Sequence, residues 1–223
     1  GAFLRQSLVA YGGYLYLAGF NASTTVLYSE INSDGSIGVW NETTVLPAAR
    51  SYPVTLASNG YIYVIGGKSS GGVAQSTVYY APINANGTVG AWSTTTALPD
   101  IGFDFSGGVN GGYLYVTGGE VGGNAEYQVL YGKQNTDGTI STWNTASLLS
   151  ERTNQHASAV NSDFIYVLGG YKSVGSTATS SVFYSQINNG KSSRDTFWGL
   201  GLSDYVPTGT YMGSTTFIGV FAP

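Results

Sequence analysis

Apolar residues recur along the chain in short runs, and polar, glycine-rich segments separate them. Four runs of six or seven residues share an aromatic–apolar–Tyr–apolar pattern and start 47, 52 and 51 residues apart, at residues 14–19, 61–67, 113–119 and 164–170. Tyr- and Val-rich runs bounded by Gly and Asn are typical of β-strands, and no segment keeps a helical period. The pattern therefore predicts an all-β protein built from a repeat of about 50 residues.

Two further markers keep the same register. A tyrosine follows each run, with spacings of 52, 51 and 53 residues (Tyr28, Tyr80, Tyr131 and Tyr184). In the first three units a tryptophan stands five residues after a turn glycine and 21 residues before the next run (Trp40, Trp92 and Trp143). Three markers in register make the repeat secure.

Each unit is predicted to form four short strands. In the second unit we expect them at Tyr52–Ala57, at Tyr61–Ile65, near Thr77–Ile83, and in a segment that ends at Trp92. Asn-Gly and Asp-Gly pairs supply the positive φ angles of tight hairpin turns. Repeated four-stranded sheets are the blades of a β-propeller. The expected blades are residues 1–46, 47–98, 99–148 and 149–202.

The pattern weakens after Gly190. Phe217–Phe221 still lies 53 residues after Phe164–Leu168, so we interpret residues 203–223 as a degenerate, partial fifth blade. A propeller must close, because an open ring exposes sheet faces and edges. The chain is thus a single propeller domain or a fragment of one. Further blades could close the ring, or the last strands of the chain could complete the first blade or pair with a neighbouring subunit by self-association.

The markers together resemble the kelch family over about residues 1–190. They are the double glycine after a Tyr-Val strand, the Tyr of the third strand, and a Trp six residues after Asp34, Asn86 or Asp137. Residues 46–50 look like the family's linker into the next blade. The chain departs from the family at Ala18, which we expect to replace the first glycine of the pair, and at Gly102, which takes the place of the linker arginine.

The resemblance is to bacterial-type kelch chains related in fold to galactose oxidase, without the copper site. His156 is the only histidine and there is no cysteine, so the copper ligands are missing. The resemblance implies a kelch-like propeller that works as a binding module.

Composition narrows the classes of function. Only 9% of residues are charged, against about 25% in an average domain, whereas 42% are apolar and 18 are tyrosines. Disorder is excluded, because such a chain can bury a core. The net charge of −4 argues against nucleic acid, and no apolar stretch is long enough for a membrane span. Absence of cysteine excludes disulfides and is compatible with an extracellular or cell-surface protein.

Candidate catalytic groups are few. No Gly-x-Ser-x-Gly elbow accompanies His156, and we expect this histidine to pack near the central channel. The Asn32–Gly35 turn has too few carboxylates for a calcium loop and is interpreted as a hairpin turn. We expect no catalytic residue, metal or cofactor. One alternative stays open: Asp104 and Glu151 converge at the channel mouth of a carbohydrate-active enzyme.

Candidate binding residues gather where the blade linkers meet the loops between second and third strands. These loops are polar and glycine-rich, at residues 20–25, 68–76, 120–126 and 171–180. Arg50 and Arg152 are expected to share one linker position after the tryptophan, where they either lock neighbouring blades or recognise a ligand. The aromatic residues are placed to stack on a ligand. The candidates are Arg50, Tyr52, Phe103, Asp104, Arg152, His156 and Tyr171.

Three Asn-x-Ser/Thr triplets are candidate glycosylation sites, at Asn21, Asn41 and Asn86. All three fall in expected loops or at strand ends. The sequence as a whole predicts a secreted or cell-surface, non-enzymatic binding and assembly module for a protein or glycan partner.

Overall fold

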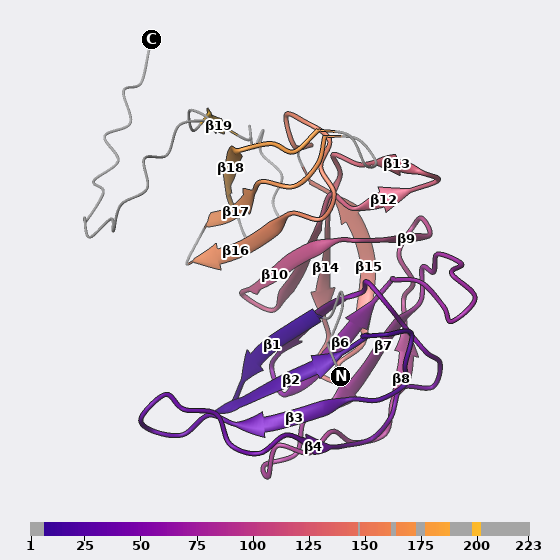
Figure 1. Cartoon of the computed structure of the whole chain (residues 1–223), viewed down its shortest axis with the longest axis vertical. Coiled ribbons are helices and arrows are strands. Elements are labelled where there is room, and N and C mark those ends of the chain that lie inside the picture. The colour runs from indigo at the N-terminus through magenta and orange to yellow at the C-terminus, as the bar shows by residue number, and fades with distance from the viewer. Residues whose placement is uncertain (1–6, 147, 162–163, 173–176, 188–197, 202–223) are drawn as a thin grey trace.

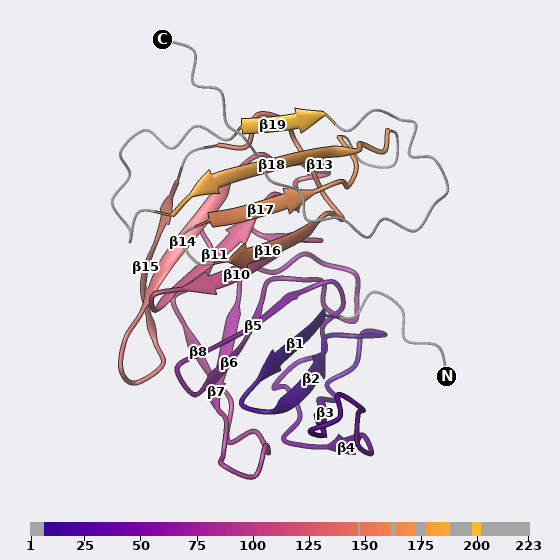
Figure 2. The same cartoon turned by 90° about the vertical axis from the view of Figure 1, so that its left-hand side faces the viewer.

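A computed structural model describes residues 7–146, 148–161, 164–172, 177–187 and 198–201. These residues form strands and loops and contain no α-helix, so none of the described segments is a helix that could cross a membrane. The sheets are antiparallel, and four of them have four strands each. They follow one another in chain order along an arc (Figures 1 and 2).

The four large sheets are the blades, and in each the strands pair in chain order. Blade 1 consists of β1 (Ser7–Tyr11), β2 (Tyr14–Ala18), β3 (Leu27–Glu30) and β4 (Asn41–Glu42). Blade 2 consists of β5 (Val54–Ser58), β6 (Tyr61–Ile65), β7 (Val78–Pro82) and β8 (Ser93–Thr95). Blade 3 consists of β10 (Ser106–Asn110), β11 (Tyr113–Thr117), β14 (Val129–Gln134) and β15 (Ile140–Thr145). Blade 4 consists of β16 (Ala157–Asn161), β17 (Phe164–Leu168), β18 (Ser181–Gln186) and β19 (Trp198–Gly201).

The all-β propeller architecture with four four-stranded blades is confirmed. The first strands β1, β5, β10 and β16 contact one another in order along the inner side of the arc. The predicted partial fifth blade, residues 203–223, lies outside the described residues.

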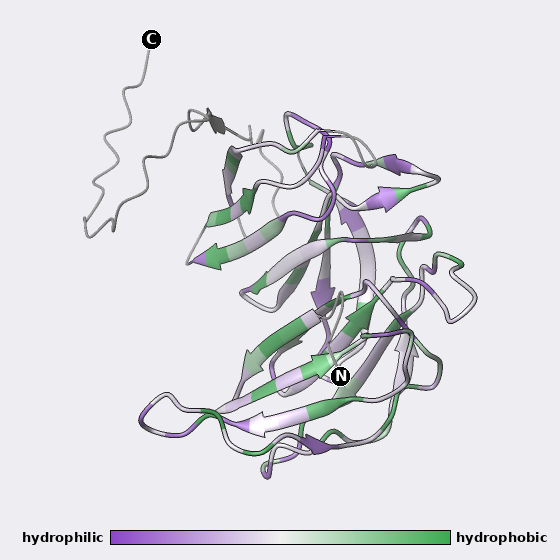
Figure 3. Cartoon of the chain, viewed as in Figure 1, coloured by the Kyte–Doolittle hydropathy of each residue, from purple (hydrophilic) through white to green (hydrophobic). Residues whose placement is uncertain are grey.

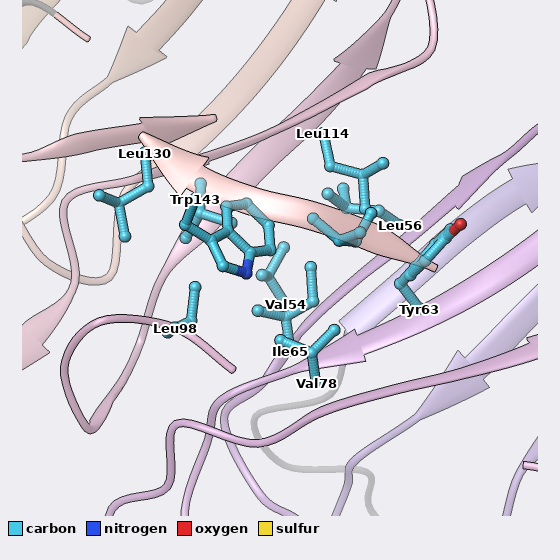
Figure 4. Close-up of a cluster of buried hydrophobic side chains, with 11 residues drawn as sticks. Val54, Leu56, Tyr63, Ile65, Val78, Leu98, Leu114, Leu130 and Trp143 are labelled. Atoms are coloured by element: carbon cyan, nitrogen blue, oxygen red, sulfur yellow. The ribbon is translucent and has the colours of Figure 1, made fainter. Parts of the chain in front are cut away.

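The hydrophobic core lies between blades. One cluster joins blade 2, through Val54, Leu56, Tyr63, Ile65, Val78 and Leu98, to blade 3, through Leu114, Val116, Leu130, Ile140 and Trp143 (Figure 4). Each fully buried side chain of this kind stabilises the fold by about 1.5–3 kcal/mol. Apolar stretches accordingly fall within the strands and polar ones in many of the turns (Figure 3).

The hairpin turns between third and fourth strands share one hydrogen-bonding pattern. Asp34 Oδ1 accepts bonds from the backbone N and hydroxyl of Ser36, at 2.9 and 2.6 Å. Asp137 binds Thr139 in the same way, at 3.0 and 2.6 Å. These bonds, the hydroxyl bond first, lower the pKa of both exposed carboxyls. The turns act through local geometry, as the turn residues predict.

The prediction that the fourth strand of the second unit ends at Trp92 is wrong, because β8 begins only at Ser93. Gly90 N still bonds to Pro82 O, and regular pairing resumes with Ser93 opposite Tyr80. Trp92 lies in this interruption and donates its indole N–H to Thr44 O of blade 1 at 2.9 Å. The indole of Trp92 thus contacts the preceding blade from the residue just before β8.

The expected departure at Ala18 is also corrected. Strand pairing places Ala18 opposite Ser7, just as Ile65 lies opposite Val54. The first glycine of the pair is therefore kept as Gly19, with φ of 66°, and Phe20 takes the place of the second. A side chain at Gly19 would overlap Pro53 of the next blade.

Candidate functional site

The loops between second and third strands and the linkers between blades form one surface, here called the loop face. Each linker runs between the loop of the blade before it and the loop of the blade it enters. In the linker that enters blade 2, Arg50 pairs with Ser23 of the blade 1 loop, and Ser51 pairs with Lys68 of the blade 2 loop. In blade 3 the pairing between linker and loop is longer and forms a small three-stranded sheet of β9 (Gly102–Phe103), β12 (Glu120–Val121) and β13 (Asn124–Ala125). Backbone pairing thus fixes the loop face.

Three residues hold equivalent positions on this face, and all have positive φ. They are Tyr52 (59°), Asp104 (56°) and Gln155 (52°). Asp104 N donates to Tyr52 O at 3.1 Å, and Gln155 N donates to Asp104 O at 3.4 Å. Positive φ is costly for side chains of this size and gathers at functional sites. A continuous backbone chain therefore presents one side chain from each of blades 2, 3 and 4.

An aromatic pair with a cation above it lies next to this chain. The rings of Tyr52 and Phe103 meet edge to face, with centroids 6.0 Å apart. Lys68 Nζ lies 3.6 Å from the centroid of Phe103 and 5.5 Å from that of Tyr52. Phe103 is buried, whereas Tyr52 and Lys68 are half-buried. The ammonium gains about 0.5–2 kcal/mol from such rings and is held in one place.

Two polar side-chain pairs lie toward blade 4. Gln155 Nε2 donates to Asp104 Oδ2 at 3.1 Å. Lys172 Nζ lies 3.0 Å from Glu151 Oε2. The two acids of the enzymatic alternative, Asp104 and Glu151, thus have separate partners. In the part of the chain that the structure describes, no group of three His, Asp or Glu residues is arranged to hold a metal.

Arg50 and Arg152 lie in different environments. Arg50 is buried, with its guanidinium 4.8 Å from the Tyr79 ring centroid and 3.2 Å from the Tyr79 hydroxyl. The side chain of Arg152 is 49% exposed, lies 3.6 Å from Glu126 and stacks on Tyr127. The expectation that they share one linker position is wrong, because Thr153, not Arg152, makes the backbone bridge equivalent to that of Arg50.

His156 lies inside the molecule beside the first strands. Its Nε2 is 2.8 Å from the Thr117 hydroxyl, which in turn contacts the Ser158 hydroxyl. Burial lowers its pKa to about 4, so the imidazole is neutral near pH 7. It lines a hollow of about 470 Å³ between the first strands, with 8% of its surface exposed. This environment is that of a packed histidine.

The remaining candidates lie at the surface. Tyr171 is 38% exposed, and its backbone bridges Asn154 and Ala178. The three glycosylation candidates, Asn21, Asn41 and Asn86, are exposed. Asn86 Oδ1 accepts bonds from the backbone N and hydroxyl of Thr88, in the same turn pattern as the aspartates.

Sequence reasoning missed Lys68 and Gln155. Lys68, Glu120 and Tyr171 occupy equivalent positions, each bridging the linker residue of its own blade. Gln155 is the third member of the positive-φ series. Aligning the repeats at the double glycine and counting outward would have found both residues.

A relative and a solved structure both point to the kelch-type repeat. No family model matches the chain. Over 130 residues, which are 57% of the chain, it is 29% identical to human Kelch-like protein 33, and the match spans 23% of that protein. The solved structure of YjhT, a kelch-type β-propeller, superposes with a TM-score of 0.73 at 16% identity. That superposition covers 92% of this chain and 67% of YjhT.

Proposed function

Because the chain is a kelch-repeat β-propeller, we propose that it is a non-enzymatic binding and assembly module whose loop face takes a protein partner. Kelch propellers are in general protein-binding modules. The chain spans only part of its relatives' length, so their activities and partners are not transferred to it.

The aromatic cluster of Tyr52, Phe103 and Lys68 carries the proposal. It joins side chains of neighbouring blades on a hydrogen-bonded backbone, so it costs little entropy to order on binding. Charged groups such as the Arg152–Glu126 and Lys172–Glu151 pairs lie toward blade 4. Half-buried Tyr52 and Lys68, packed on buried Phe103, would form the centre of a protein interface, and the charged pairs would form its polar rim.

A protein partner is favoured over a glycan. A sugar stacks on the open face of an aromatic ring, but Lys68 already covers Phe103, which is itself only 7% exposed. Tyr171 is the exposed aromatic that a glycan partner would use.

We further propose that the protein is secreted or displayed at the cell surface. The absence of cysteine and the exposure of Asn21, Asn41 and Asn86 support this location. Mass spectrometry of protein isolated from its natural source should find sugar on Asn21 or Asn41. Recovery of the protein in the cytoplasmic fraction, with both asparagines unmodified, would contradict the proposal.

The proposed binding surface is tested with two source-independent probes, a phage-displayed random-peptide library and a glycan array. Peptides selected on the natural protein should lose at least about tenfold in affinity for Lys68→Met, which keeps the aliphatic stem but removes the charge. The matched control is Lys133→Met in β14 of blade 3, an exposed lysine beside the hairpin turn at residues 135–138 and away from the loop face.

Affinity should be unchanged in the control, and the glycan array should stay blank. Peptides that bind both variants as well as the natural protein would overturn the assignment to the loop face. Glycan binding that is lost in Tyr171→Ala would replace the protein partner with a sugar.

A further inference from the structure

Four asparagines of the chain precede a glycine, and in this pair asparagine can modify itself. They are Asn59, Asn86, Asn110 and Asn189, the last of which lies outside the described residues. Glycine has no Cβ to block the approach of its backbone N to the asparagine side chain. The same reactive pair thus occurs in three described surroundings, and hydrogen bonds distinguish them.

The reaction needs only water. The glycine N forms a bond to Cγ of the asparagine, and the side-chain amide leaves as ammonia, so a cyclic succinimide results. Water then opens this ring at one of its two carbonyls. The product is aspartate or isoaspartate, in which the main chain runs through the side-chain carbon. The asparagine side chain must turn toward the next peptide N, and that N must be free to move.

Asn59 is held at both reacting groups. Its Nδ2 donates to Gln134 Oε1 of blade 3 at 3.1 Å. Gly60 N donates to the Tyr11 hydroxyl of blade 1 at 2.7 Å. The amide and the attacking N are therefore bound to different neighbouring blades, and both bonds must open before the ring can form.

Asn86 is held within its own turn. Its Oδ1 accepts bonds from the backbone N and the hydroxyl of Thr88, at 3.2 and 2.7 Å. Gly87 N donates to Asn84 O at 2.9 Å, and Gly87 itself is buried. A Cβ at Gly87 would overlap the Tyr14 ring, so this turn is also packed against blade 1. The asparagine is exposed, but its partner is not free.

Asn110 is held at neither group. It is the last residue of β10 and pairs with Tyr113 across a turn of only Gly111 and Gly112. Among the described residues, neither the Asn110 side chain nor Gly111 N has a hydrogen-bond partner. Gly111 is exposed. All three turn residues line a hollow of about 720 Å³ at the turn ends of β1, β5 and β10, which leaves room for the side chain to turn and for water to enter.

Solvent exposure alone gives a different order. Asn59 and Asn86 are exposed, whereas Asn110 is half-buried. A ranking by accessibility would therefore place Asn110 last, and a ranking by hydrogen bonds places it first.

We propose that Asn110–Gly111 is a self-modification site, at which the folded protein converts Asn110 through a succinimide into aspartate or isoaspartate as it ages. The proposal is independent of the proposed function, because it uses no residue of the loop face.

The two products have different effects on blade 3. Aspartate adds a negative charge at the hollow. Isoaspartate also adds a carbon to the main chain beside the short turn, so residue 110 loses its register with Tyr113. Tyr113 packs against the core cluster that blades 3 and 4 share. Isoaspartate should therefore loosen the contact between these blades, whereas aspartate should largely keep it.

Peptide mapping by mass spectrometry tests the order of reactivity. The natural protein is incubated at mildly alkaline pH, both folded and in urea. In the folded protein Asn110 should convert on the order of tenfold faster than Asn59 or Asn86, because each hydrogen bond that must open slows those two several-fold. In urea the three should convert at similar rates, since the unfolded chain keeps little of this structure.

One substitution tests the cause of the order. Tyr11→Phe keeps the ring but removes the hydroxyl that binds Gly60 N, so conversion of Asn59 should speed up several-fold while that of Asn110 stays the same. The matched control is Tyr14→Phe, because the Tyr14 hydroxyl makes no hydrogen bond among the described residues. It should leave all three rates unchanged.

Two further variants test the consequence. After ageing, the natural protein should melt at a lower temperature than before. Asn110→Gln should melt unchanged, because its longer side chain closes the ring far more slowly. Fresh Asn110→Asp, which carries the charge without the extra carbon, should melt close to the fresh natural protein.

Three results would overturn the proposal. The first is conversion of Asn59 or Asn86 in the folded protein as fast as that of Asn110. The second is an Asn110 that stays intact in the folded protein while all three asparagines react in urea. The third is an unchanged rate at Asn59 in Tyr11→Phe, which would remove hydrogen bonding as the cause.

Discussion

His156 shows how one buried side chain connects the fold to pH. Burial lowers its pKa to about 4, and the ordinary value is 6.5. The unfolded chain therefore takes up a proton below about pH 6.5, which the folded chain binds only below about pH 4. The stability that neutral His156 contributes is complete above pH 6.5 and is lost as the pH falls toward 4.

We expect the free energy of unfolding of the natural chain to fall more steeply between pH 7 and pH 4.5 than that of His156→Gln. The full difference corresponds to roughly 3 kcal/mol, at 1.36 kcal/mol per pKa unit. Urea denaturation at several pH values measures this difference. The carboxylates contribute equally to both proteins, so their contribution cancels when the two are compared. Parallel pH profiles for the two proteins would show that His156 is not held neutral.

Alanine substitutions at two glycines distinguish the cost of backbone strain from the cost of steric overlap. Gly12 and Gly19 have similar φ angles, 60° and 66°, but a Cβ at Gly12 meets nothing within 4 Å, whereas one at Gly19 would overlap the ring of Pro53. Gly12→Ala should cost about 1 kcal/mol from the left-handed backbone alone. Gly19→Ala should cost about 1–3 kcal/mol more, from overlap with the next blade. Equal losses in urea denaturation would show that Pro53 moves away freely.

At the scale of elements, the contact between blades depends on threonine hydroxyls. Thr95 Oγ1 accepts the bond from Ile140 N, whose residue is 2% exposed. Thr95→Val keeps the shape but leaves this buried N–H without a partner, at a cost of about 1–3 kcal/mol. Thr94→Val, on the exposed side of the same strand, should change stability by less than about 0.5 kcal/mol. Chemical denaturation measures the free energy of unfolding of the two variants. Equal values would show that the Thr95 hydroxyl does not stabilise the contact between the blades.

The repeat period predicted the first three strands of blade 2 well, because the same apolar positions must face the same neighbours in every unit. The fourth strand of blade 2 was misplaced because the tryptophan was used to mark its end. Trp92 and Trp143 make the same bond to the preceding blade, but Trp92 precedes β8 and Trp143 lies within β15, so the tryptophan marks the contact between blades and not the strand boundary. The departure at Ala18 was misassigned because the glycine pair was counted without the strand register that places Gly19 opposite the next blade.

Only part of the candidate site was accessible from the sequence, for a related reason. Tyr52 and Phe103 were found because aromatic residues beside the loops are placed to stack on a ligand. Lys68 and Gln155 are ordinary polar residues, and they matter only through positions that backbone pairing brings together. Arg50 was misinterpreted as equivalent to Arg152, because one residue of register decides whether a linker side chain points into the core or toward solvent.

At the scale of the whole molecule, the blades hold the linkers and loops of three successive units on one side. The central claim is that this loop face is the binding surface. Hydrogen–deuterium exchange of the natural protein, free and bound to a peptide selected on it, tests the claim most directly. We expect slower exchange on binding in residues 68–76, 102–104, 120–126 and 151–155, and no change in the turns at residues 32–35, 84–87 and 135–138. Protection of those turns with unchanged exchange across the loop face would contradict the account.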